Sequence, residues 1–191
     1  MHVPRDEAKG NPFDHPLERQ KNVGDLPAQR SGALLRHDVE RVLTAAATRA
    51  MGIDSAPMGN AQLFEADRRA LRLVAQSGFT TEFTDFFRIV EDTASACGTA
   101  SSTGRPVWVS DVAQSPIFAQ TDSLEVILAA GSRAVASIPV ASPAGQLIGM
   151  ISLHHQRPIG WTEERRLELE QFCRSVGALL DGMIQSDPGE R

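Results

Sequence analysis

Cys97 and Cys173 carry the most reactive side chains of this sequence. Cys97 lies near the predicted start of a short helix, where the helix dipole could stabilise a thiolate and lower the pKa of the thiol. Such a thiolate could serve as a redox sensor, a tetrapyrrole attachment point or a catalytic nucleophile. However, no histidine follows Cys97 directly, and no second cysteine lies nearby in the sequence to resolve a sulfenic acid. Because cysteine is also among the most frequently buried residues, we expect both cysteines to pack in the core.

Two adjacent histidines, His154 and His155, end a predicted strand. Neighbouring residues of a strand point to opposite faces, so this pair cannot chelate one metal ion as a helical i, i+4 pair does. His154 shares its face with Met150 and Ser152. It either points into a cavity, where it could hydrogen bond to a ligand, or lies exposed at the strand end. His37, beside Asp38 on a predicted helix, resembles a phosphoacceptor, but no nucleotide-binding glycine motif accompanies it.

Sequence motifs of the common enzyme classes are missing. No nucleophilic triad, paired carboxylates, glycine-rich phosphate loop or zinc motif is visible. The sequence therefore predicts a protein without enzymatic activity.

Residues 132–155 predict a β-hairpin that is buried on both faces. Its turn residues are Ser142, Pro143, Ala144 and Gly145. One face of the first strand carries Ala134, Ala136, Ile138 and Val140, and in the second strand Leu147, Gly149, Ile151 and Leu153 alternate with Ile148, Met150, Ser152 and His154. Because both rows are apolar or small, one face can pack helices while the other borders a cavity. Ser137 and Ser152 would be neighbours there, bonded either to a ligand or to nearby backbone.

Helical patterns flank the hairpin at both ends of the chain. The first helix is predicted from Ser31 to a stop near Gly52, with an apolar stripe of Leu35, Val39, Val42 and Ala46. The last helix is capped by Thr162, and its predicted stripe is Leu169, Phe172, Val176, Leu179 and Met183.

The middle of the chain alternates strands with short helices. Strands are predicted at 60–66, 70–76 and 106–110, and short helices at 95–102 and 122–130. Another short helix, capped by Thr80 or Thr81, carries Phe83, Phe86, Phe87 and Val90. This order predicts an α+β fold: a central antiparallel sheet with the N- and C-terminal helices on one face and short helices and loops on the other.

Length and composition indicate one globular domain with extensions. The chain has 191 residues, a net charge of −5, 41% hydrophobic and 23% charged residues. Residues 1–30, with four prolines, are predicted to be a flexible or loosely docked extension, 31–185 the domain and 186–191 a tail. The absence of basic clusters argues against nucleic-acid binding, and no apolar run could cross a membrane, so we expect a cytoplasmic location.

The hairpin also resembles the end of a GAF domain. The matching residues are Arg133-Ala134-Val135, Ser137, Pro139, Ser142, Gly145, Leu147, Gly149-Met150, Ser152 and His154. Upstream, residues 96–100 and 104–112 resemble the middle of this family, and 60–63, 71–75 and 78–79 its opening strands. The similarity spans roughly residues 33–185 in consistent order.

The resemblance implies a ligand cavity between the sheet and the middle segments. The candidate ligand-binding residues are Cys97, Trp108, Asp111, Phe118, Arg133, Ser137, Met150, Ser152 and His154. Arg133 and Asp111 could form its charged rim or a plain exposed pair. The ligand and any cofactor stay unidentified. Haem is possible in principle with His154 as axial ligand, whereas the signature of cyclic-nucleotide-binding members is not present.

Three functions are compatible with this resemblance. The first is a sensory or regulatory small-molecule-binding module in signal transduction, acting through a homodimer or a partner protein. Its dimer contact would use Val42, Leu43, Ala47, Leu180 and Ile184 on the terminal helices. The second is an enzyme of the free methionine-(R)-sulfoxide reductase type, which needs several cysteines. The third is a dimerisation or interaction module with a filled core and no ligand.

Overall fold

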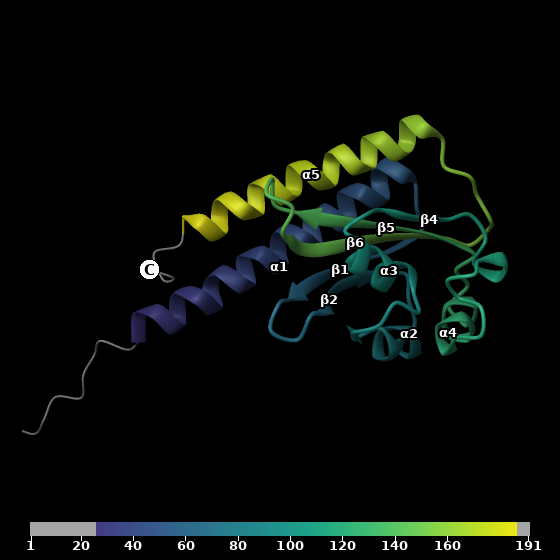
Figure 1. The fold of residues 1–191 in the computed structure, drawn as a ribbon, viewed down its shortest axis with the longest axis horizontal. Coiled ribbons are helices and arrows are strands. Elements are labelled where there is room, and N and C mark those ends of the chain that lie inside the picture. Colours follow the sequence, from purple (N-terminus) through teal and green to yellow (C-terminus); the bar gives the residue numbers. More distant parts are fainter. Residues whose placement is uncertain (1–25, 187–191) are drawn as a thin grey trace, which may run out of the picture.

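A six-stranded antiparallel sheet is the centre of the computed structural model, which describes residues 26–186 (Figure 1). The strands are β1 (Met58–Glu65), β2 (Ala70–Ser77), β3 (Ile89–Val90), β4 (Val107–Val109), β5 (Ala134–Ala141) and β6 (Leu147–His155). Their order is β3-β2-β1-β6-β5-β4, so the predicted hairpin, β5 and β6, lies inside the sheet beside β1. The α+β fold predicted from the sequence is confirmed.

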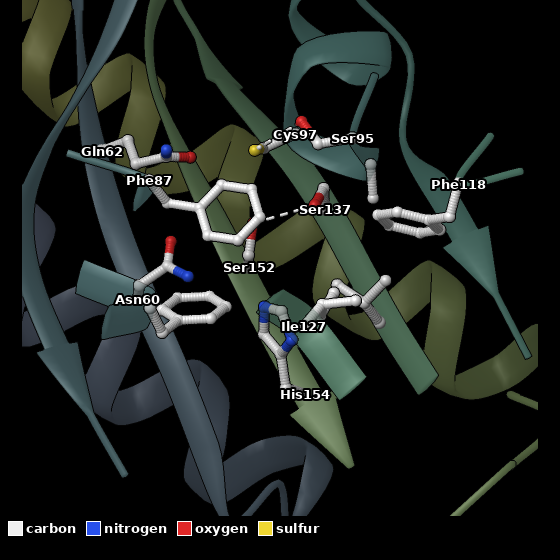
Figure 2. A pocket seen from close by; sticks show the side chains of 13 residues that line it. Asn60, Gln62, Phe87, Ser95, Cys97, Phe118, Ile127, Ser137, Ser152 and His154 are labelled. Atoms are coloured by element: carbon white, nitrogen blue, oxygen red, sulfur yellow. Dashed lines mark hydrogen bonds between the residues drawn. The ribbon is translucent and has the colours of Figure 1, made fainter. Parts of the chain in front are cut away.

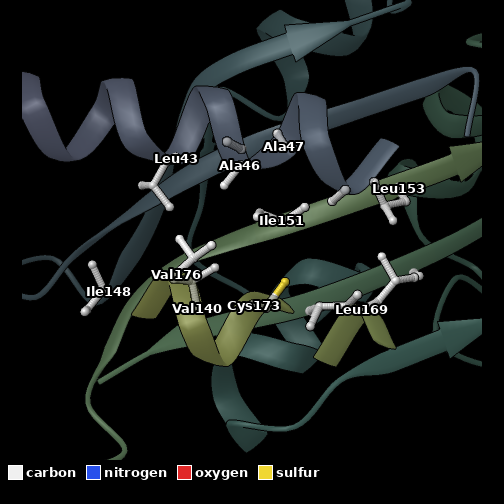
Figure 3. Close-up of a cluster of buried hydrophobic side chains, with 14 of the residues drawn as sticks. Leu43, Ala46, Ala47, Val140, Ile148, Ile151, Leu153, Leu169, Cys173 and Val176 are labelled. Carbon is white, nitrogen blue, oxygen red and sulfur yellow. The ribbon is translucent and has the colours of Figure 1, made fainter. Parts of the chain in front are cut away.

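Two long helices cover one face of the sheet. They are α1 (Leu26–Asp54) and α5 (Glu163–Gln185), which lie side by side (Figure 1). Leu43 from α1 and Leu169 and Leu180 from α5 are fully buried against Ile151 of β6 (Figure 3). At Gly177 the backbone of α5 touches β5, since a Cβ there would lie 1.9 Å from the carbonyl oxygen of Ala141.

Short helices cover the other face. They are α2 (Thr81–Phe86), α3 (Ala96–Thr103) and α4 (Asp122–Ala129), with a 3₁₀ turn, η2 (Val112–Gln114), before α4. Local signals fix their ends. The hydroxyls of Thr80 and Ser95 accept backbone N–H bonds at the starts of α2 and α3, and Gly104, with φ of 65°, ends α3. These segments form a second apolar core that is separate from the core under α1 and α5.

The first helix is longer than predicted at both ends. It begins at Leu26, ahead of Ser31, and Pro27 lies in its first turn, where a missing N–H has no helical partner to lose. It continues through Gly52 to Asp54, and Ser55 ends it with a left-handed φ of 55°. Residues 1–25 of the predicted extension and 187–191 of the predicted tail lie outside the described residues.

The predicted stripe of the last helix is confirmed at Leu169 and Val176 and wrong at Leu179. The buried face is rotated towards Cys173 and Leu180, and Phe172 and Met183 are only partly buried. The buried residues of this helix are Leu169, Cys173, Val176, Gly177 and Leu180, whereas Leu179 is 56% exposed. The contact of Gly177 with β5 explains this rotation, because Cys173 and Leu180 are its i−4 and i+3 neighbours on the helix face. The predicted dimer contact is therefore also wrong in part: Leu43, Ala47 and Leu180 are buried within the chain's own core.

Two strand details also differ from the prediction. Val140 pairs with Gly149 and Ala141 with Leu147, so Ile148 is an extra residue at an irregularity in β6. Strict alternation fails there, and Ile148 joins the core under the long helices while Leu147 packs on the other side. Val90 is not part of the helix that carries Phe83. It forms β3 and pairs with Leu71.

Candidate functional site

A small buried cavity lies between the sheet and the short helices (Figure 2). Its polar wall comes from the sheet and from α3: Asn60, Gln62, Ser95, Cys97, Ser137, Ser152 and His154. Its apolar wall comes from the short helices, the segments around them and β5: Phe83, Phe87, Ala96, Phe118, Ile127 and Val135. Among these described lining residues, none carries a carboxylate, a guanidinium or an ammonium group.

The polar wall is built on a row of side chains across three central strands. Asn60 of β1 faces Ser152 of β6, which in turn faces Ser137 of β5. All three are buried, and the two serine hydroxyls are 2.8 Å apart and hydrogen bonded. Gln62 lies two residues beyond Asn60 on the same face of β1. This row concentrates hydrogen-bonding groups in the middle of an otherwise apolar sheet.

Two acceptors in this wall have no partner among the described residues. The side-chain oxygens of Asn60 and Gln62 are buried without a hydrogen bond, although the two residues are only 5% and 1% exposed. An unsatisfied buried polar group typically destabilises a fold by about 1–3 kcal/mol. Most buried polar groups are paired, so two unpaired oxygens in one cavity indicate that something other than protein donates to them.

Sequence reasoning missed both of these residues as site residues. The signal for them was present. Asn60 and Gln62 alternate with the apolar Ala61 and Leu63 in β1. This strand lies beside the hairpin, and both faces of β1 are buried at these positions. A polar residue that is buried in such a strand does not serve solubility, so its burial indicates another role.

His154 stands at the end of the polar wall as a neutral imidazole. Its Nδ1 lies 2.8 Å from the Ser132 hydroxyl, and its ring meets Phe79 edge-on at a centroid distance of 4.9 Å. Burial, with a smaller effect from the charge of His155, lowers the pKa of His154 to about 3. The ring is thus a hydrogen-bonding group of the cavity and carries no charge at neutral pH.

Cys97 lacks the lowered pKa of a reactive thiol. Burial raises its pKa, and its hydrogen bond with Ser95 opposes this shift only in part. Its Sγ lies 3.3 Å from the Ser95 hydroxyl at the start of α3. Cys173 is buried in the core on the other side of the sheet, and burial raises its pKa to about 12. The two thiols therefore cannot act as an attacking and a resolving pair in this conformation.

Aromatic side chains close the cavity from outside. Phe79 and Phe83 stack with ring centroids 3.8 Å apart, and Phe87 lies 4.6 Å from Phe83. Phe83 is the buried residue of α2, whose outer side is exposed. We call Phe79, Phe83 and Phe87 the aromatic lid. Phe83 lies on a six-residue helix, and Phe83 and Phe87 are buried in the second apolar core, against which Phe79 packs.

The cavity is much smaller than the hollow that the sequence predicts. The space between its lining atoms amounts to about 290 Å³, but the centre of a water molecule can occupy only about 20 Å³ of it. That is room for about one water, well below the ~300–1,000 Å³ of a site for a drug-sized ligand. A larger molecule can enter only if the aromatic lid moves.

A second polar cluster lies on the far side of β6 from His154. The carboxylate of Asp54, at the end of α1, contacts His155 Nε2 at 2.7 Å and accepts bonds from Trp161 Nε1 at 3.0 and 3.1 Å. We call Asp54, His155 and Trp161 the helix junction, because it joins α1, β6 and the segment before α5. Consecutive residues of β6 thus contact the cavity and the junction.

Neither a group of metal-ligating side chains nor a membrane-spanning helix is found among the described residues. Within residues 26–186, no group of three or more histidine, cysteine, aspartate or glutamate side chains could hold a metal ion. In the same part of the chain, no helix is both long and apolar enough to cross a bilayer.

Comparison with known proteins assigns this architecture. A family model described as "GAF domain" matches residues 60–180. The chain belongs to the GAF family. No curated protein matches its sequence.

Solved GAF-fold structures resemble the chain at low identity. One is the domain of a putative two-component sensor histidine kinase protein from Sinorhizobium meliloti 1021 (19% identity, 76% of this chain and 92% of that one, TM-score 0.61). Another is the blue-light absorbing form of the Thermosynechococcus elongatus PixJ GAF domain (16%, 79% and 89%, 0.61). A third is a type II free methionine-R-sulfoxide reductase from Thermoplasma acidophilum (16%, 78% and 96%, 0.60). At these identities they show the shared fold.

The GAF cavity contains five of the nine predicted site residues: Cys97, Phe118, Ser137, Ser152 and His154. Met150 is fully buried in the adjoining apolar core. Trp108 lies on the opposite side of the sheet, because it pairs with Ala136 of the helix-facing row. There it packs on Trp161 and under Arg166. Asp111 caps η2 and bonds to Arg133 at 3.3 Å, and neither of them lines the cavity.

His154 makes the stability of this GAF domain depend on pH. Its pKa is about 3 in the folded protein against an ordinary value of 6.5, so between these values the unfolded chain binds a proton that the folded chain does not. The stability that the neutral His154 contributes is therefore fully present above about pH 6.5 and is lost as the pH falls towards 3. From pH 7 to pH 5 we expect urea unfolding of the wild type to lose ~2 kcal/mol more than that of His154→Gln. His37→Gln, an exposed control, should follow the wild type. Equal pH dependence of wild type and His154→Gln would contradict this assignment.

Proposed function

We propose that this GAF domain is a sensory module of signal transduction that binds a small molecule in the cavity and acts without catalysing a reaction. The observation that carries the proposal is the pair of buried, unpaired oxygens of Asn60 and Gln62. A fold that merely needed a filled core would be more stable with apolar side chains at these positions. The sensor-kinase and photoreceptor origins of two structural neighbours support the same role.

In this proposal the aromatic lid controls entry. The closed cavity fits about one water molecule, so the resting state is the lid-closed state. A ligand shifts the equilibrium towards an open or remodelled lid by the difference in its affinity for the two states. Movement of α2 would draw Phe83 and Phe87 out of the second apolar core and would leave the core under the long helices in place.

The proposed output path runs along β6. A ligand that contacts His154 acts on the residue next to His155, whose ring is bound to Asp54 of the helix junction. A displacement of this strand end would change how the end of α1 is held against the segment before α5. The long helices are thus the elements that receive the signal.

We further propose that these helices form a homodimer. Four large apolar side chains are exposed among the described residues, and three of them, Leu34, Leu167 and Leu179, lie on α1 or α5. The N-terminal part of α1 also extends beyond the sheet (Figure 1). A second copy of the chain, packing α1 and α5 against their counterparts, would cover these residues. This contact replaces the one predicted from the sequence.

The reductase alternative gains no support from the thiols. The structural neighbour from Thermoplasma acidophilum is a reductase, but this chain holds Cys97 as a buried thiol with a raised pKa and Cys173 across the sheet. The resolving step of a two-cysteine mechanism would require the sheet to come apart.

A screen of small metabolites by thermal unfolding tests the sensor proposal. A ligand at about 100 times its Kd should stabilise the protein by ~2.7 kcal/mol and raise Tm by roughly 5–10 °C. Ser152→Leu, which fills the cavity, should abolish the shift, while the exposed α5 control Ser175→Leu should keep it. The proposal fails if no compound stabilises the wild type, or if Ser152→Leu responds as the wild type does.

Sedimentation velocity tests the dimer. The wild type should sediment as a dimer and the double variant Leu34→Glu/Leu179→Glu as a monomer, because carboxylates would be buried in the contact. Phe86→Glu, at an exposed site on α2, is the matched control and should remain dimeric. A monomeric wild type, or a double variant that still dimerises, would rule out this interface.

A further inference from the structure

The chemistry of the cavity wall restricts which ligand it can take, and the restriction rests on the sensor function proposed above. No described lining residue carries a formal charge, and His154 is neutral at physiological pH. A buried ion without a counter-charge is strongly disfavoured. Anions and cations are therefore poor occupants, and the ligand is an uncharged molecule.

The oxygens of Asn60 and Gln62 are unpaired acceptors of the wall, and each belongs to an amide whose NH2 group can also donate. Asn60 Oδ1 and Gln62 Oε1 both need a donor and find none in the described structure. The two residues lie on one face of β1 at i and i+2, about 7 Å apart along the strand. A molecule that satisfies both must present two N–H or O–H groups that diverge from its centre.

His154 supplies the complementary donor. The Ser132 hydroxyl lies 2.8 Å from His154 Nδ1 and 3.5 Å from the Ala134 carbonyl oxygen, so the shorter contact is the better use of its proton. We assign the ring proton to Nε2, the tautomer in which Nδ1 accepts from Ser132. Figure 2 shows a ring nitrogen of His154 directed to the side of the cavity where Asn60 lies. An N–H group there can donate to a carbonyl oxygen of a ligand.

The opposite wall favours a flat molecule. Phe83, Phe87 and Phe118 present aromatic rings to the cavity, and rings of this kind stack on planar groups. The wall thus offers two amide groups, an imidazole and aromatic faces.

We propose that the cavity binds a small, planar, uncharged molecule with two N–H donors and one carbonyl acceptor, of the cyclic urea or lactam class, with Asn60 and Gln62 receiving its donors and His154 binding its carbonyl. The class follows from the juxtaposition of the two unpaired amide oxygens with the imidazole.

Three probes of one ring shape test this selectivity. Imidazolidin-2-one has two N–H donors and no charge, 1,3-dimethylimidazolidin-2-one lacks the donors, and 2-aminoimidazolinium has the donors and a positive charge. Each is titrated into ¹⁵N-labelled full-length protein, and the side-chain amide signals of Asn60 and Gln62 are followed by NMR. We expect imidazolidin-2-one to shift both signals and to bind at least about tenfold more tightly than either analogue.

Substitutions that remove the side-chain amide locate the effect. Asn60→Leu and Gln62→Leu should each weaken imidazolidin-2-one binding by about tenfold or more. Gln146→Leu, at the exposed hairpin turn, is the control and should bind as the wild type does.

Two results would overturn the ligand class while leaving the sensor function in place. One is equal or tighter binding of the dimethyl or the cationic probe in the cavity. The other is failure of all three probes while some metabolite stabilises the protein in a manner that Ser152→Leu abolishes. If neither the probes nor any metabolite binds, the sensor function itself fails, and the ligand class fails with it.

Discussion

The burial of the central strands on both faces is the constraint on which this structure depends. β1, β5 and β6 lie between two separate apolar cores, one under the long helices and one under the short ones. Any polar side chain on these strands must find its hydrogen bonds inside the protein. Ser137 and Ser152 do so by bonding to each other, and His154 does so through Ser132. Asn60 and Gln62 leave one oxygen each unpaired, which marks the polar wall as a site for something other than protein.

The same sheet separates the cavity from the long helices, which receive the signal in the proposed function. On one face of β6, Ser152 and His154 border the cavity, and on the other face Ile151 and Leu153 pack under the long helices. Because consecutive strand residues alternate between faces, a change at the cavity reaches the helix side through one peptide unit. Gly177 keeps α5 in direct backbone contact with β5. No side chain lies between the two backbones at that point, so a movement of β5 would displace α5 directly.

The sequence predicted the positions of the helices and strands well. It predicted less well which side of a helix faces the sheet. Alternation in the hairpin identified the cavity-facing row of Ser137, Ser152 and His154, and capping residues such as Thr80 and Thr162 marked helix starts that the structure confirms. The stripe of α5 was right at Leu169 and Val176 and wrong at Leu179, because Leu179 is as apolar as Leu180 and periodicity alone cannot tell which one faces the sheet. That choice is made by a tertiary contact, the fit of Gly177 on Ala141.

The sequence predicted the strand residues of the candidate site but not the aromatic lid that closes it. Trp108 was among the residues predicted to line the cavity, but the register with Ala136 places it under the long helices. The size of the cavity depends on how Phe83 and Phe87 fold back over the sheet, which no local pattern encodes. Asn60 and Gln62 were overlooked because polar residues in a strand are usually solvent-facing, and their burial follows from the position of β1 beside the hairpin.

The free energy of unfolding of ligand-free Asn60→Leu tests most directly whether the polar wall is kept for a ligand. Leucine has nearly the shape of asparagine and removes the unpaired oxygen, so the variant should equal the wild type in stability or exceed it by about 1–2 kcal/mol. A loss of about 1 kcal/mol or more would mean that Asn60 is already satisfied within the fold, and that its role is structural.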